Sequence, residues 1–165
     1  MSGIFTWLDR GVEILARGIR WLALAMVLVT LVVVVLRYVF NVGAIPLQEA
    51  VMYMHGVLFL LGIPYGLRQG THVRVDIFYA RRLAPWQTHI NLVGHIIFLL
   101  PLGIFITVTC WPYAVASWRV FEGSPEVGGI PAIFLLKSLL PIFGLLLVSQ
   151  GLVEIRRAWL ALGRQ

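Results

Sequence analysis

Four long apolar stretches constrain this chain more than any other feature of its sequence. They run from about residue 21 to 40, 47 to 67, 85 to 114 and 131 to 153. A helix needs about 20 predominantly apolar residues to cross the hydrocarbon core of a bilayer. The pattern therefore predicts an all-α membrane protein with four transmembrane helices, in which residues 1–165 form a single membrane domain.

The composition supports a membrane protein. Hydrophobic residues make up 60% of the chain and charged residues only 12%, whereas soluble domains carry about 25% charged residues. The net charge of +6 could indicate a nucleic-acid partner, but the 13 basic residues lie around the apolar stretches, as a membrane topology signal requires. We therefore expect no nucleic-acid partner. The single cysteine, Cys110, cannot form an internal disulfide.

The basic residues divide between the two sides of the predicted membrane domain. Ten lie before the first stretch, between the second and third, or after the fourth: Arg10, Arg17, Arg20, Arg68, Arg74, Arg81, Arg82, Arg156, Arg157 and Arg164. Arg37, Arg119 and Lys137 belong to the other side. The positive-inside rule then predicts that both termini and the second connection are cytoplasmic, a topology with N and C termini in.

Two segments outside the apolar stretches are candidates for helices that lie on the membrane surface. In the first twenty residues, apolar and charged side chains fall on opposite sides of a helix, which predicts an amphipathic interfacial helix. The alternative is a simple helical extension of the first span. Between the second and third spans, "VDIFYARRL" (75–83) fits a short cytoplasmic interfacial helix, and Asp76 would cap its start.

Ionisable residues inside spans are costly unless they are paired or reach the membrane surface. Arg37 and Glu49 lie at similar depths on either side of a short turn, which predicts a salt bridge between them; the alternative is that each reaches lipid headgroups or water. Lys137 begins about seven residues inside the fourth span. It either extends outward to the surface or binds Glu49, Glu126 or a lipid phosphate.

The most polar stretch is "RQGTHVRVDIFYARRLAP" (68–85), where His72, Arg74 and Asp76 are spaced two apart. One histidine and one aspartate are too few for a metal site, and the arginines mark the stretch as juxtamembrane. The chain has no GxxxxGK[ST], HExxH or GxSxG motif. We therefore expect no enzyme activity and no catalytic, metal-binding or cofactor-binding residues.

Two histidines leave a different function open. His55 and His95 lie at nearly the same predicted depth in neighbouring antiparallel spans, as two axial ligands of a haem b would. The alternative function is therefore a haem-binding membrane anchor of a redox complex, although a neutral histidine bonded to a neighbouring helix is the commoner case. An independent small transporter or channel is a third class, which the lack of a polar lining through the spans disfavours.

Several motifs in a fixed order resemble one family. "LRYVFN" (36–41) closes the first span, and "PLQEAVMYMHGVLFLLGIPYGLRQGTHVRVDIFY" (46–79) follows it. In the second motif, an acidic residue, a glycine-containing apolar run, a basic residue, a histidine and an aspartate succeed one another: Glu49, Gly62, Arg68, His72 and Asp76. With "EGSPEVGGIPAIFLLKSLLPI" (122–142), they make the chain resemble the small membrane subunit of TRAP (tripartite ATP-independent periplasmic) transporters.

The resemblance implies a complex in the bacterial inner membrane. A periplasmic solute-binding receptor captures a small organic anion, and a large multispanning subunit carries it inward by a cation-coupled, elevator-like movement. The small subunit would be non-catalytic, would brace the large one and would help to dock the receptor.

The resemblance also suggests which residues meet the partners. Arg68, His72, Arg74 and Asp76 would contact the large subunit or membrane phospholipids on the inside. Arg37, Glu49 and an outer loop with Arg119, Glu122 and Glu126 would face the receptor or the outer edge of the large subunit.

Overall fold

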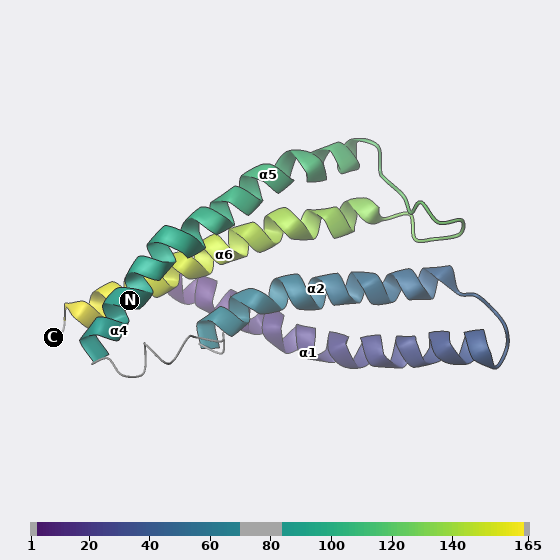
Figure 1. Ribbon diagram of the computed structural model, residues 1–165, viewed down its shortest axis with the longest axis horizontal. Helices are drawn as coiled ribbons and strands as arrows, with labels where there is room; N and C mark the ends of the chain where they lie inside the picture. The colour runs from purple at the N-terminus through teal and green to yellow at the C-terminus, as the bar shows by residue number, and fades with distance from the viewer. Residues whose placement is uncertain (1–2, 70–83, 164–165) are drawn as a thin grey trace.

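The structure is a computed structural model that describes residues 3–69 and 84–163. All of its secondary structure in these ranges is helical (Figure 1). The elements are α1 (Gly3–Tyr38), α2 (Ile45–Gln69), α4 (Ala84–Gly94), the π-helix η1 (His95–Leu99), α5 (Leu100–Arg119) and α6 (Ile133–Leu162).

Four segments of these helices are long and apolar enough to cross a membrane, which confirms the predicted fold to that extent. They are Arg17–Tyr38, Ile45–Leu67, Trp86–Arg119 and Ile133–Leu162. The third is built from α4, η1 and α5 in succession. In η1 the helix widens by one residue per turn, so that the Leu100 N–H donates to the carbonyl of His95. Pro101, which has no N–H to donate and crowds the preceding turn, follows directly.

Residues 3–20 do not form a separate helix. α1 runs without interruption from Gly3 to Tyr38, so they extend the first span as a helix, which was the alternative expectation. Whether this extension lies on the membrane surface stays a prediction. The short interfacial helix expected at 75–83 lies outside the described residues.

The turn between α1 and α2 follows from its sequence. Asn41 adopts a left-handed conformation with φ 53°, which asparagine tolerates better than most residues. The N–H of Val42 then bonds back to the carbonyl of Leu36 over 2.9 Å, so one of the last free carbonyls of α1 is satisfied. Pro46 occupies the first turn of α2, where its missing N–H costs nothing.

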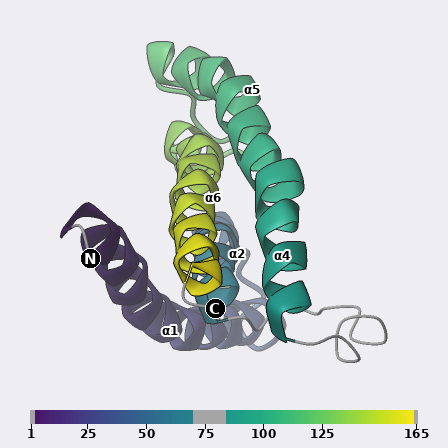
Figure 2. The ribbon, with the colours of Figure 1, turned by 90° about the vertical axis from the view of Figure 1, so that its left-hand side faces the viewer.

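The helices form an open array with α6 at its centre (Figure 2). α5 packs on one side of α6 and α2 on another, while α1 packs mainly against α2. The start of α1 and the end of α6 lie at one end of the array, and the 39–44 turn and the 120–132 loop lie at the other (Figure 1). The array therefore buries α6 most and α1 least.

Small residues let α5 and α6 approach closely. A Cβ added to Gly144 would lie 2.8 Å from the backbone nitrogen of Thr107 and 2.9 Å from the carbonyl oxygen of Gly103. A Cβ added to Gly103 would lie 2.9 Å from Val148. Interfaces between membrane helices are typically built in this way, because backbones that approach closely gain packing contacts.

Candidate functional site

The best-defined polar site lies where the 120–132 loop joins the ends of α2, α5 and α6. The loop carries two of the acidic residues expected to face a partner, and it contacts the two ionisable residues predicted at the ends of α2 and α6. We call the contacts around Glu49 the Glu49 clasp and those around Lys137 the Lys137 pair.

The Glu49 clasp ties α2 to the loop. One carboxylate oxygen of Glu49 accepts a hydrogen bond from the Ser124 hydroxyl. The other accepts a hydrogen bond from the backbone N–H of Ile130 over 2.5 Å. Gly129 fits tightly beside them, because a Cβ at that position would lie 2.7 Å from Glu49 Oε1. One side chain of α2 thus holds two points of the loop.

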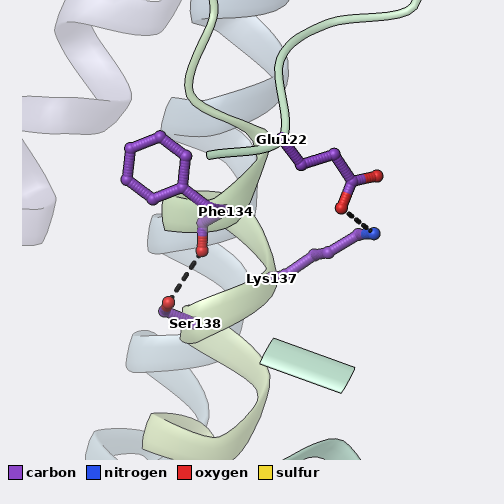
Figure 3. Close-up of polar contacts among 4 residues, drawn as sticks. All are labelled: Glu122, Phe134, Lys137 and Ser138. Atoms are coloured by element: carbon purple, nitrogen blue, oxygen red, sulfur yellow. Dashed lines mark hydrogen bonds and ion pairs between the residues drawn. The ribbon is translucent and has the colours of Figure 1, made fainter. Parts of the chain in front are cut away.

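The Lys137 pair ties α6 to the start of the same loop (Figure 3). Lys137 Nζ lies 2.5 Å from Glu122 Oε2 and 4.2 Å from the centre of the Tyr113 ring. The Lys137 side chain is only 17% exposed, and that of Glu122 is 38% exposed. The hydrogen bond from Lys137 lowers the pKa of Glu122 below its usual value of 4.5, because a neighbouring cation favours the carboxylate.

An aromatic cluster shapes the end of α5 next to this pair. The ring of Phe134 lies 4.5 Å from Trp118 and 5.8 Å from Phe121, both in edge-to-face geometry. Trp118 Nε1 also donates to the Ser138 hydroxyl over 2.7 Å. Phe121 adopts a left-handed conformation with φ 44°, which costs about 1–3 kcal/mol for a non-glycine residue. This left-handed residue follows the end of α5 and directly precedes Glu122.

The ion pairs in the structure differ from the predicted ones. Arg37 is exposed and makes no ion pair with Glu49 within the described ranges 3–69 and 84–163, since the Glu49 carboxylate is turned to the loop. Lys137 does bind a carboxylate, but it is that of Glu122 and not that of Glu49 or Glu126.

The other predicted site residues divide into three groups. Arg119 and Glu126 are exposed, at the end of α5 and in the loop. Arg68 belongs to the last turn of α2. His72, Arg74 and Asp76 lie outside the described residues.

The two histidines of the haem alternative come from separate neighbours of α6. His55 is exposed on α2 and stacks on Phe59, with ring centres 6.1 Å apart. His95 begins η1, and both α2 and η1 pack against α6. The described part of the chain holds no group of three or more histidine, cysteine or acidic residues that could bind a metal.

A network of three polar side chains on α6 was not predicted from the sequence. The buried Gln150 donates to Glu154 over 3.0 Å, and Arg157 donates to the same carboxylate oxygen over 2.7 Å. The spacings of three and four residues are those at which side chains meet on one helix face. A search for such spacings would have found it.

Comparison with known proteins decides the family. Residues 26–161 match the family described as "Tripartite ATP-independent periplasmic transporters, DctQ component". The chain belongs to the DctQ family. This match covers the last third of α1, all of α2, α4, η1 and α5, the 120–132 loop and nearly all of α6. Neither the curated proteins nor the solved structures gave a match.

Membership in the DctQ family confirms the resemblance found in the sequence. A DctQ component is the small membrane component of a TRAP transporter, a multi-pass transporter subunit and not an enzyme. It implies a TRAP complex in which DctM and DctP are the partners. The loop site therefore belongs to a membrane subunit of a TRAP transporter.

Proposed function

We propose that this DctQ component braces the large elevator-type subunit DctM and helps to dock the periplasmic receptor DctP during cation-coupled uptake of a small organic anion. The observation that carries the proposal is the family match over residues 26–161. The chain itself binds no substrate or coupling ion. Its contribution is to hold a fixed scaffold and to present surfaces to the two partners.

The orientation of the chain is part of the proposal. Residues 1–165 form one membrane domain in the bacterial inner membrane, with both termini in the cytoplasm. The basic residues near both termini support this orientation by the positive-inside rule. The start of α1 and the end of α6 lie at the same end of the array, as this orientation requires (Figure 1). The 39–44 turn and the 120–132 loop then face the periplasm.

The open helix array supports the bracing role. Of the described large apolar side chains, many along α1, η1 and α5 are exposed, among them Val27, Leu31, Phe98 and Phe105. Lipid covers such surfaces as readily as protein does, so packing against another helix must come from shape and small residues. An array that leaves two flanks open offers DctM a long apolar face.

The cytoplasmic side holds the second set of proposed contacts. Arg68, His72, Arg74 and Asp76 contact DctM or membrane phospholipids there. Clusters of basic residues beside a span attract anionic headgroups, each contributing about 1 kcal/mol. The proposal assigns these residues to fastening and orienting the subunit.

The charged residues in and around the 120–132 loop fall into two groups. Arg119 and Glu126 are exposed and are available to DctP or to the outer edge of DctM. Glu49 and Lys137 instead hold the loop in shape. A loop whose conformation is fixed in advance loses less entropy when a partner binds.

Co-purification and uptake test the proposal. We expect this chain to co-purify with tagged DctM. We also expect cells that lack this chain to lose solute uptake by the complex. Glu49→Lys is expected to weaken DctP-dependent uptake, and His72→Ala to weaken retention by DctM. If both variants leave assembly and uptake unchanged, the assignment of these residues is wrong. Solute flux into vesicles that contain only this chain would overturn the bracing role itself.

A further inference from the structure

A groove of about 550 Å³ runs beside the Lys137 pair, where α2 and α5 both flank α6. Its apolar lining includes Met52 and Leu60 of α2 and Leu140 of α6. Its polar lining includes Tyr113, Glu122 and Lys137. Polar and apolar side chains share this groove: Glu122 belongs to the loop and Lys137 to the start of α6, while Leu140 lies almost one turn further along α6 and Leu60 lies within α2.

We infer that this groove binds one phospholipid with a zwitterionic head group that carries a primary ammonium. One acyl chain lies along Leu60 and Leu140, and the head group lies at the Lys137 pair. This inference goes beyond the proposed bracing role, because it assigns a ligand to the chain itself.

The charges of the Lys137 pair match such a head group. Lys137 carries three N–H donors and Glu122 about four acceptor positions, and their mutual bond of 2.5 Å uses one of each. The remaining ammonium donors can bind a phosphate oxygen, while the carboxylate accepts from the ammonium of the head group. A pair with no net charge gives a purely anionic head group no such advantage, because repulsion from Glu122 opposes attraction to Lys137.

The size and depth of the groove favour a lipid over a helix of a partner. An α-helix with its side chains is about 10 Å across, so the groove volume equals less than about two turns of helix. The polar end lies at the boundary of the fourth span, because Lys137 follows the first residue of α6 by only four positions. An acyl chain with its head group at this boundary fits both the size and the polarity.

Native mass spectrometry of the complex with DctM tests the inference. The complex is placed in nanodiscs of equal parts phosphatidylethanolamine and phosphatidylglycerol and then released in mild detergent. We expect retained phosphatidylethanolamine in the unaltered complex and none with Leu60→Trp, which fills the apolar part of the groove. The matched control is Leu145→Trp, a half-exposed position on α6 that does not line the groove, and it should retain the lipid.

A second variant tests the head-group chemistry without altering the groove. Glu122→Gln removes the acceptor charge and leaves the cation of Lys137. The preference for phosphatidylethanolamine over phosphatidylglycerol should fall by about tenfold, the effect of losing one charge-assisted hydrogen bond. The inference is overturned if the unaltered complex retains no lipid, if it retains both lipids equally, or if Leu60→Trp retains as much as Leu145→Trp. Cross-linking of a cysteine at Leu140 to DctM would also overturn it, since a protein would then occupy the groove.

Discussion

The α5–α6 pair and the α1–α2 hairpin are both antiparallel pairs of apolar helices, but they are packed in different ways. α6 buries Gly144, Leu147, Gln150 and Gly151 against its neighbours. In the first span, no residue of the most apolar segment is buried within the chain. Composition alone does not separate the two pairs, since both are rich in large apolar residues.

The difference comes from where small residues lie. Gly103 and Gly144 face each other across α5 and α6, with backbone atoms in near contact. Gly11 and Gly18 of α1 meet nothing within 4 Å. In a bilayer, apolar residues alone do not drive helices together, because lipid tails are equally apolar. Close packing in this chain therefore follows opposed small residues and not the amount of apolar surface.

The largest effect should come from Gly144→Leu. The new side chain would meet the backbone of Gly103 and Thr107, which cannot yield as a side chain can, so we expect a loss of about 3 kcal/mol. The measurement is the free energy of unfolding in detergent micelles titrated with SDS. Gly18→Leu in α1 is the matched control and should not lower this free energy, because a Cβ there meets nothing within 4 Å and leucine favours a helix more than glycine does. Equal losses in the two variants would refute the contrast between the pairs.

Glu49→Ala should have the next largest effect, because the Glu49 side chain connects α2 to the 120–132 loop. It removes the acceptor of bonds from Ser124 and Ile130, and we expect a loss of about 2 kcal/mol, as for hydrogen bonds to a charged group. Limited proteolysis should cut the 120–132 loop faster in this variant. Glu126→Ala, at an exposed position of the same loop, is the control, and a similar rate of cleavage there would argue against the clasp.

The spans were predictable from the sequence, because hydropathy over about 20 residues is a local property. The partners of Glu49 were not. Ser124 and Ile130 are 75 and 81 residues away along the chain, and nothing local marks a serine or a backbone N–H as the partner of a distant carboxylate. Similar depth on either side of a short turn favoured Arg37 instead, and that pairing is wrong.

One signal in α2 could have corrected this error. Glu49 and Gly56 are seven residues apart, so they lie on the same face of the helix. Gly56 packs against Leu136 of α6. A carboxylate on that face points toward α6 and the loop before it, and not toward α1. Small residues at helical spacing thus carry information about which face of a span meets another helix.

A smaller effect is expected from Gly129→Ala, which tests the fit of the clasp without removing a charge. The added Cβ would lie 2.7 Å from Glu49 Oε1, so the carboxylate or the loop must shift, at a cost of about 1 kcal/mol. Gly123→Ala is the matched control in the same loop, because its Cβ would meet Pro131 at an ordinary distance of 3.5 Å. The free energies of unfolding should separate the two variants. If they coincide, the clasp is not tightly fitted.

The smallest effect concerns the second attachment of the loop, through Glu122. Its pKa is lowered in the folded chain by the hydrogen bond from Lys137, so the carboxylate is stabilised by folding. This contribution is complete above the usual glutamate pKa of 4.5 and is lost as the pH falls below it, through the lowered value. Unfolding measured from pH 7 downward should therefore show a decline in stability that Glu122→Gln reduces. A decline that is identical in the unaltered protein and in Glu122→Gln would mean that the Lys137 pair does not hold the loop.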